Sequence, residues 1–258
     1  MVIGKWAESL SVLGGASMLS RGPLGLAGGV GRGMVGRFPM PSSTVENYVK
    51  EIFLLQAADR SRPVPMGQVA NALDVSAGTA TTMMKSLERA GLLAYTPRRG
   101  VRLTPEGEAL ALGMIRRHRL VELFLVKVLK LDWTEIHDEA EQLEHALSDR
   151  VLDALDEFLG HPEADPHGDP IPRARGPFEE RALESLRTCG VGETVRVARI
   201  SDQNAEFLQF VEANALKPGT RLKVTHRDRV ADSTTIEGAK GGRTLTLGST
   251  AAGKILVE

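Results

Sequence analysis

Apolar side chains recur every three to four positions from residue 43, which is the period of an amphipathic helix. Ser43 followed by Glu46 is a capping-box pattern, so we expect this helix to begin at Ser43 and to end before Pro63. Two more helices are predicted at about 66–73 and 76–90, joined by a short turn. The apolar positions of the first helix are Val45, Tyr48, Ile52 and Leu55.

Two short runs of strand-forming residues follow, at 92–95 and 101–103, around a turn that contains Pro97 and Gly100. Thr104-Pro105-Glu106 then supplies an N-cap, a proline at the first helical position and a first-turn acid. Helix, helix–turn–helix, two-stranded wing and long helix, in this order, predict a winged helix-turn-helix DNA-binding module. The alternative is a small helical domain with an accidental hairpin, which the apolar spacing from Gln68 to Leu92 disfavours.

The remaining sequence changes character once. Helices are predicted at about 105–130, 134–147 and 149–159, and the stretch 160–178, rich in Pro, Gly, His and Asp, is predicted as a linker. Beyond residue 183, alternating and β-branched runs indicate a small barrel of about five strands with one short helix. The strands are expected at 194–200, 221–225, 234–236, 244–247 and 254–257, and the helix at about 204–213.

These elements predict a mainly α-helical chain with a β-rich C-terminal domain. The expected divisions are a flexible tail at 1–40, a DNA-binding domain at 41–103, helices at 104–160, a linker at 161–182 and a barrel at 183–258. The tail holds ten glycines and a single acidic residue, and we recognise no secretory signal in it.

Composition narrows the possible functions. The 258 residues contain one cysteine, Cys189, which excludes an internal disulfide framework and a multi-cysteine zinc site and suits a cytoplasmic location. No apolar stretch reaches about 18 residues, so no membrane-spanning helix is expected. The net charge of −1 conceals an uneven distribution, because residues 41–103 are mildly basic whereas residues 104–182 carry nine basic and eighteen acidic side chains. Phosphate is the expected partner of the first block and cations of the second.

Histidine and glutamate stand at helical spacing within the acidic block. In the helix predicted at 134–147, two carboxylates and an imidazole are placed at i, i+3 and i+4, and the preceding helix carries a His–Glu pair four apart. Two facing helices can thus offer oxygen and nitrogen ligands to a divalent cation. An ordinary solvated helix face is the alternative, and the position just after a DNA-binding wing favours the metal. The residues are Glu141, Glu144, His145, His137, His118 and Glu122.

The helix predicted at 76–90 and the wing carry the candidate DNA contacts. The N-terminal turns of the second helix of such a motif usually enter the major groove, where small hydroxylated residues touch thymine methyls and phosphates. Wing arginines are candidates for phosphate or minor-groove contacts, with plain solubility as the alternative. The candidates are Ser76, Ala77, Gly78, Thr79, Thr82, Arg98, Arg99 and Arg102.

No enzymatic signature is found. The sequence has no His-Glu-x-x-His motif, its glycines form no phosphate loop, and Cys189 has no histidine nearby in the sequence. A metal-binding enzyme would also need a general base beside a nucleophile. We therefore expect that the protein is not an enzyme and has no catalytic residues.

With these residues in view, the chain resembles the diphtheria-toxin-repressor family of metal-dependent transcriptional regulators over about residues 41–258. The resemblance implies a winged helix-turn-helix, a helical dimerisation domain and a Src-homology-3-like (FeoA-like) barrel. It also implies a homodimer that binds a pseudo-palindromic double-stranded operator and represses metal-uptake genes. It rests on Arg116-Arg117-His118-Arg119-Leu120-Val121-Glu122, on His137-Asp138-Glu139-Ala140-Glu141-Gln142-Leu143-Glu144-His145, and on His161-Pro162 with Pro166-His167-Gly168-Asp169-Pro170-Ile171-Pro172.

The resemblance implies two metal sites. A primary site would use Asn47, Glu141, Glu144 and His145, and an ancillary site would use His118, Glu122 and His137, completed from the barrel by Gln203 and Glu206. The iron-responsive branch has a cysteine where Glu141 stands, so the chain is more similar to the manganese-responsive branch. Oxygen and nitrogen donors without thiolate suit Mn²⁺ as the cofactor, with Fe²⁺ as the alternative.

Three positions depart from the family pattern. Asn47 stands where the family supplies Met or Asp, Lys50 stands where the manganese branch can add a Glu, and Thr82 stands where a base-reading Gln is frequent. The primary site therefore carries less negative charge than the family pattern.

Two further questions are left open by the sequence. A metal-independent winged-helix regulator that senses a small organic ligand is the alternative function. The barrel can either supply metal ligands or serve as a peptide- or self-interaction module.

Overall fold

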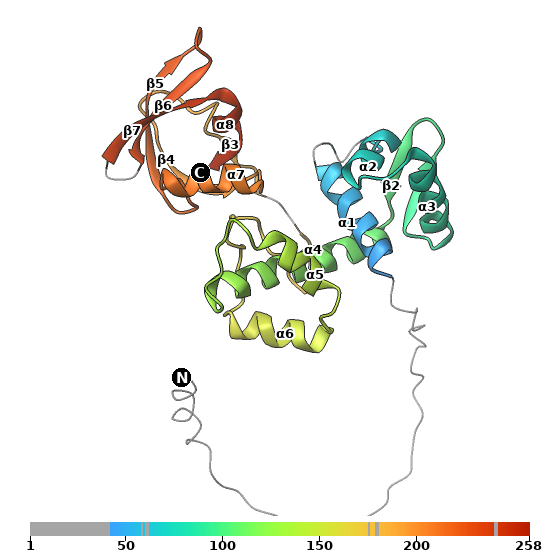
Figure 1. Cartoon of the computed structure of the whole chain (residues 1–258). Coiled ribbons are helices and arrows are strands. Elements are labelled where there is room, and N and C mark those ends of the chain that lie inside the picture. The colour runs from blue at the N-terminus through green and yellow to red at the C-terminus, as the bar shows by residue number, and fades with distance from the viewer. Residues whose placement is uncertain (1–41, 58, 60–61, 175, 179–180, 240–241) are drawn as a thin grey trace, which may run out of the picture. The chain divides into compact units, whose positions relative to one another are not determined.

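The computed structural model describes residues 42–57, 59, 62–174, 176–178, 181–239 and 242–258 (Figure 1). The tail predicted at 1–40 lies outside the described residues. The helices are α1 (Ser43–Ala57), α2 (Met66–Ala72), α3 (Ala77–Arg89), α4 (Pro105–Lys127), α5 (His137–Glu144), α6 (Asp149–Phe158), α7 (Ala205–Ala213) and α8 (Ser249–Gly253). The strands are β1 (Leu93–Thr96), β2 (Gly100–Leu103), β3 (Glu184–Ser185), β4 (Thr194–Ile200), β5 (Arg221–Asp228), β6 (Ser233–Ala239), β7 (Arg243–Gly248) and β8 (Ile255–Val257). None of the described helices is both long and apolar enough to cross a bilayer.

The elements from α1 to β2 share a core of their own. Ser76 fixes the start of α3, because its Oγ accepts a hydrogen bond from the backbone N–H of Thr79 at 3.1 Å. β1 and β2 pair antiparallel, with Leu93 opposite Leu103, and form the predicted wing. The buried core includes Val49, Ile52, Val69, Met84, Leu87 and Val101.

Helix α4 is anchored directly to this wing. The Thr104 Oγ1 accepts a hydrogen bond from the backbone N–H of Gly107 at 3.2 Å, which caps the helix as predicted. Gly107 lies so close to the end of the wing that a Cβ there would stand 1.9 Å from the backbone oxygen of Leu92. Only glycine fits this contact, so the first turn of α4 is held against the DNA-binding module.

Two local predictions are wrong. Glu46 does not close a capping box, because its carboxylate is turned toward His145 instead. The helix predicted at 134–147 is shorter, since α5 covers only His137–Glu144. The Asp132 carboxylate accepts hydrogen bonds at 2.9 Å from both the backbone N–H and the hydroxyl of Thr134, which holds this stretch in a turn.

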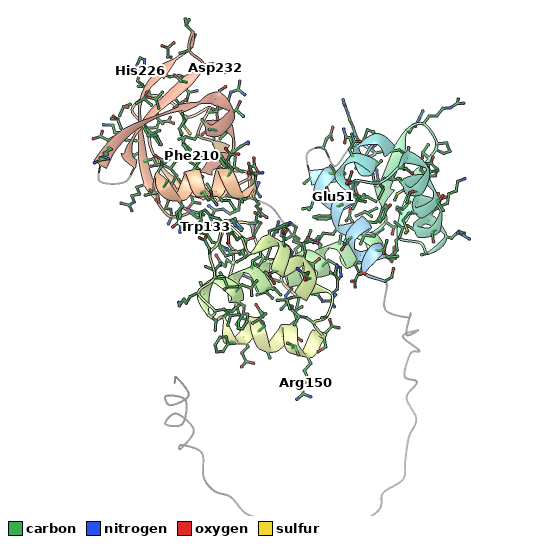
Figure 2. All side chains as sticks on the ribbon, in the orientation of Figure 1. Glu51, Trp133, Arg150, Phe210, His226 and Asp232 are labelled. Atoms are coloured by element: carbon green, nitrogen blue, oxygen red, sulfur yellow. The ribbon has the colours of Figure 1, made fainter. Side chains whose placement is uncertain are left out.

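The C-terminal part is a six-stranded sheet in the order β3-β8-β4-β5-β6-β7, with every neighbouring pair antiparallel. The five predicted strands correspond to β4 to β8, whereas the two residues of β3 and the five of α8 are too short to show a period in the sequence. Trp133, labelled in Figure 2, lies before α5 yet is buried in the core of this sheet with Leu208, Val211 and Leu216. This side chain therefore connects the helical part to the barrel.

Candidate metal centre

Histidines and carboxylates from three segments, namely α4, the start of α5 and the loop after α6, lie close together. His118 and Glu122 stand one turn apart on α4 and are 7% and 0% exposed. His137 is the first residue of α5. Asp165 and His167 come from the loop that follows α6, and both are buried. Burial of so many ionisable groups is costly unless each is paired or binds a cation.

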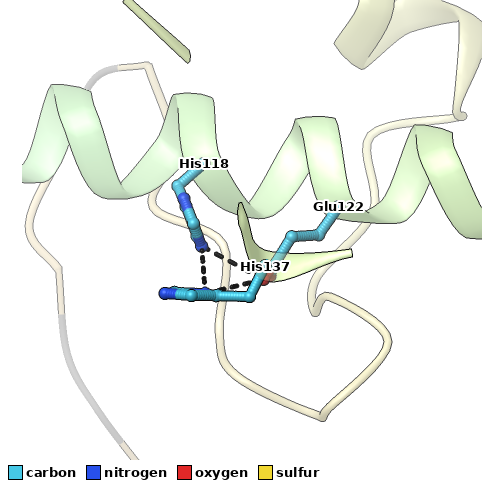
Figure 3. Close-up of side chains that lie close together, drawn as sticks. All are labelled: His118, Glu122 and His137. Carbon is cyan, nitrogen blue, oxygen red and sulfur yellow. Dashed lines mark hydrogen bonds and ion pairs between the residues drawn. The ribbon is translucent and has the colours of Figure 1, made fainter. Parts of the chain in front are cut away.

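The first cluster consists of His118, Glu122 and His137 (Figure 3). The Nε2 atom of His118 lies 3.1 Å from Oε1 of Glu122 and 3.2 Å from Nδ1 of His137. The same Oε1 is 3.6 Å from Nδ1 of His137. Three donor atoms from two helices therefore point at one place, as the i, i+4 spacing on α4 predicts.

The protonation states of this cluster depend on each other. Burial opposes a positive charge on His118, but hydrogen bonds with Glu122 and Glu144 outweigh burial and raise the pKa of His118 to about 9. Burial likewise opposes ionisation of Glu122, yet hydrogen bonds with His118 and His137 hold the pKa of Glu122 well below its ordinary value. At neutral pH a proton on His118 thus supplies the positive charge that the carboxylates need.

A second cluster shares Glu122 and adds Asp165 and His167. The Oε2 atom of Glu122 lies 3.9 Å from Nδ1 of His167. The Nε2 atom of His167 lies 3.0 Å from the carbonyl oxygen of Trp133, so this nitrogen carries the proton and Nδ1 presents a lone pair. Burial, together with Asp169 and Glu122, raises the pKa of Asp165 well above the ordinary aspartate value.

The donor atoms of the second cluster fit a divalent cation. Among the described residues, Glu122 Oε2, Asp165 Oδ2 and His167 Nδ1 are buried side-chain atoms with no hydrogen-bond partner. Native proteins rarely leave such atoms unsatisfied, and three of them within reach of each other offer a divalent cation a set of free lone pairs. The Nε atom of Arg119 lies 3.9 Å from the same Oδ2 of Asp165. All three are oxygen or nitrogen donors, while Cys189 lies apart in the core of the barrel.

Asp165 and His167 were not among the ligands predicted from the sequence. The sequence signal was present, because His167 belongs to one of the stretches that carry the family resemblance. It was not recognised because neither residue stands at helical spacing from another candidate. The loop is held by backbone contacts instead: the N–H of Ile200 on β4 donates to the carbonyl of His167 at 2.9 Å.

The residues predicted for the primary site are arranged differently. The Lys50 ammonium of α1 lies 2.5 Å from Oε1 of Glu141 and 2.8 Å from Oε1 of Glu144. The Nδ1 atom of His145 lies 2.7 Å from Oε2 of Glu46, also on α1. The Nε2 atom of His145 lies 3.6 Å from Oε1 of Glu144. The structure therefore brings Glu141, Glu144 and His145 together, but with Lys50 between the two carboxylates and with Glu46 as the nearest acid to His145.

The other predicted ligands have separate surroundings. Asn47 is half-buried on α1, and its Oδ1 is a buried atom without a hydrogen-bond partner among the described residues. The Gln203 side-chain amide donates to Oδ2 of Asp169 at 3.1 Å, whereas Glu206 is exposed in the first turn of α7. Among the described residues, Glu206 belongs to none of the clusters of histidine and acidic side chains. Their role as ligands stays a prediction.

Sequence models of three protein families match this chain in the order of its structural parts. They are the iron-dependent repressor N-terminal DNA-binding domain at residues 40–101, the iron-dependent repressor metal-binding and dimerisation domain at residues 104–173, and the FeoA domain at residues 184–258. Together they cover most of the chain. This protein belongs to the iron-dependent repressor family.

Individual members of the family are similar to the chain at moderate identity. The diphtheria toxin repressor of Corynebacterium efficiens is 38% identical over 192 residues, which are 70% of this chain and 82% of that protein. The iron-dependent repressor IdeR of Mycobacterium tuberculosis is 38% identical over 130 residues, 50% of this chain and 55% of that protein. The solved structure of a manganese-dependent transcriptional repressor in complex with manganese is 39% identical and has a TM-score of 0.75, covering 83% of this chain and 98% of that one.

These matches confirm several predictions. The resemblance to the diphtheria-toxin-repressor family and the fold class, helical with a C-terminal FeoA-type barrel, are both correct. The repressors of this family are metal-dependent DNA-binding regulators and not enzymes, which supports the predicted function over a regulator of the organic-ligand class. DNA and a second copy of the chain are the partners that the matched domains imply.

The predicted DNA-contacting residues of this repressor lie mostly on exposed positions of α3 and the wing. The hydroxyl groups of Thr79 and the cap residue Ser76 are hydrogen-bonded at 2.8 Å. The Thr82 hydroxyl donates to the carbonyl of Gly78 at 3.0 Å. Arg98 and Arg99 occupy the tip of the wing, where Arg98 has a positive φ of 66°. Ala77, Gly78 and Arg102 are exposed as well. Their contacts with DNA stay a prediction.

Proposed function

We propose that this protein is a manganese-activated repressor of metal-uptake genes, with Fe²⁺ as the second candidate cofactor. The observation that carries the proposal is the trio of buried donor atoms without a hydrogen bond, one each on Glu122, Asp165 and His167. All are hard or borderline donors, and the single thiol lies elsewhere, which favours Mn²⁺ over metals that prefer thiolate. The similar solved structure named as a manganese-dependent repressor with manganese agrees with this choice.

The residues that would hold the metal come from three segments. Glu122 offers Oε1 to the first cluster and Oε2 to the second, so it joins His118 and His137 to Asp165 and His167. A bound divalent cation supplies the positive charge that these carboxylates otherwise take from a proton on His118. With that charge in place, α4, the start of α5 and the loop at 165–169 are held together through their side chains.

The position of α4 connects this centre to DNA. Its first turn is fixed against the wing through Gly107, and its second half carries His118 and Glu122. Any metal-dependent change in how α4 packs is therefore transmitted to the DNA-binding module. In a two-fold dimer this selects the spacing of two α3 helices over a pseudo-palindromic operator. Metal and DNA then increase each other's affinity by the same factor.

DNA-binding anisotropy tests the proposal. The protein is used to select a duplex from a random-sequence pool in the presence of Mn²⁺, and its affinity for that duplex is measured with Mn²⁺, Fe²⁺, Zn²⁺ or chelator. We expect Mn²⁺ to tighten binding by about 10–100-fold over the chelated protein. Equal affinity in chelator and in Mn²⁺ would refute the proposed function. A cytoplasmic location stays a prediction.

A further inference from the structure

Lys50 is a buried cation placed between two carboxylates of another segment. The residue is 8% exposed, and its Nζ lies 2.5 Å from Oε1 of Glu141 and 2.8 Å from Oε1 of Glu144. Glu144 is 0% exposed. Glu141 and Glu144 are one turn apart on α5, whereas Lys50 comes from α1, so this triplet fastens the DNA-binding module to the helical part.

The same carboxylates would otherwise form a cation site. Glu141 and Glu144 belong with His118 to a group of three metal-binding side chains whose donor atoms lie within 4.8 Å of one another. The positive charge that such a group needs is already present in the Lys50 ammonium. An ion that binds Glu141 through Oε1 would have to share that atom with Nζ, and like charges at this separation repel strongly.

Both oxygens of Glu144 already have partners. Its Oε1 accepts from Lys50 and lies 3.6 Å from Nε2 of His145, and its Oε2 lies 2.7 Å from Nδ1 of His118. The hydrogen bond from Nδ1 leaves the lone pair of neutral His118 on Nε2, the nitrogen that faces Glu122 and His137. Glu144 is thus a positioning residue for His118, and its second oxygen is occupied by the lysine.

A second contact fastens α1 in the same way. Glu46 lies one turn before Lys50, and its Oε2 is 2.7 Å from Nδ1 of His145 at the end of α5. The Glu46 Oε1 lies 3.8 Å from Arg117 of α4. Acidic Glu46 and basic Lys50 of α1 thus each face side chains of the opposite kind on α4 and α5, and these side-chain contacts hold α1 in place.

We propose that Lys50 is a tethered cation that takes the place of a metal ion between Glu141 and Glu144. It holds α1 against α5 whether or not metal is bound, and it confines the metal response to the clusters around Glu122. The proposal deepens the proposed function and rests on it for the role of those clusters. It assigns Lys50 as the residue that determines how many ions the chain binds.

Two readouts on the full-length protein test this assignment. Bound Mn²⁺ per chain is measured by equilibrium dialysis with elemental analysis, for the wild type and for Lys50→Met, which keeps an unbranched side chain, one atom shorter, and removes its charge. We expect Lys50→Met to bind one more Mn²⁺ per chain than the wild type. Lys127→Met, an exposed lysine on α4, is the matched control and should leave the number unchanged.

Hydrogen exchange supplies the second readout. In chelator, the amides of α1 should be protected in the wild type to within about twofold of their protection in Mn²⁺. In Lys50→Met the same amides should lose protection in chelator and regain it when Mn²⁺ is added. Protection of α1 that depends on Mn²⁺ in the wild type would overturn the proposal.

A second variant covers the case in which Lys50→Met fails to fold. Glu141→Gln is a conservative change at a half-exposed position, and we expect it to leave the number of Mn²⁺ ions bound by the wild type unchanged. Loss of one ion in Glu141→Gln would overturn the proposal. If the wild type binds no Mn²⁺, the proposed function fails, yet the gain of one ion in Lys50→Met would still support the role of Lys50.

Discussion

The Oε2 atom of Glu122 faces Nδ1 of His167 at 3.9 Å, and neither atom has a hydrogen-bond partner among the described residues. The other oxygen of Glu122 lies with His118 and His137. One carboxylate therefore belongs to both candidate clusters, which makes it the residue whose loss should have the widest effect on metal binding.

Glu122→Gln should weaken Mn²⁺ binding by at least about 10–100-fold, the loss that removing even an outer partner of a metal ligand causes. The amide keeps the size of the side chain but lacks the negative charge. Isothermal titration calorimetry with Mn²⁺ measures the effect. Glu139→Gln, at an exposed position of α5, is the control. Wild-type affinity in Glu122→Gln would show that neither cluster binds the metal.

Metal affinity should rise with pH through the range in which His118 loses its proton. The pKa of His118 is raised from 6.5 to about 9. A metal ion must displace that proton, so affinity should increase about tenfold per pH unit below pH 9. Calorimetry in buffers of different ionisation enthalpy, between pH 6.5 and 8.5, counts the protons released. No proton release would contradict a role for His118 as a ligand.

The stability of the metal-free protein should change in the opposite direction. Because the folded state raises the pKa of His118, its stabilising contribution is complete below pH 6.5 and is lost as the pH rises toward 9. The melting temperature in chelator should therefore fall over this interval, and added Mn²⁺ should reverse the fall. In His118→Gln, raising the pH from 6.5 to 9 should no longer lower the melting temperature in this way.

Asp165→Asn should stabilise the metal-free protein and at the same time weaken its binding of Mn²⁺. The pKa of Asp165 is raised by burial and by neighbouring acids, so its charge destabilises the metal-free fold near neutral pH. The asparagine oxygen can still accept the hydrogen bonds that Oδ1 receives from the N–H groups of His167 and Asp169. We expect the metal-free melting temperature to rise by about 2–4 °C, as for ~1 kcal/mol in a chain of this size. Calorimetry should show weaker Mn²⁺ binding in the same variant.

Arg99→Ala should weaken DNA binding without changing its sequence preference. Arg99 is exposed at the tip of the wing, where a guanidinium can contact phosphate. The slope of log affinity against log salt should decrease in magnitude by about 1. Anisotropy at several salt concentrations, on the selected duplex and on an unrelated duplex, measures it. A loss confined to the selected duplex would indicate base contacts instead.

Sequence reasoning located those parts of the metal centre that depend on local geometry. His118 and Glu122 share one turn of a helix, so their spacing alone predicts that they lie together. The cap residues Ser76 and Thr104 were predicted for the same reason, because each acts on a backbone group three residues away.

The contacts that sequence reasoning missed join distant segments. Lys50 and Glu141 are ninety-one positions apart in the sequence, so no helical or strand period can predict that they are in contact. His167 reaches Glu122 because Gly168, with a φ of 88°, lets its loop approach β4, where a Cβ would stand 2.0 Å from the backbone oxygen of Ala198. The sequence contains the glycine and the lysine, but only the packed chain shows what they face.

The 23 residues of α4 run from the wing to the far side of the metal centre. At about 1.5 Å per residue, roughly 22 Å of continuous helix separate Gly107 from Glu122. Over that length, a tilt of the helix axis by a few degrees displaces the far end by about an ångström. Hydrogen bonds to DNA weaken over a similar distance. On the proposed function, a small adjustment of side chains around one carboxylate would therefore be enough to change the fit of α3 and the wing to DNA.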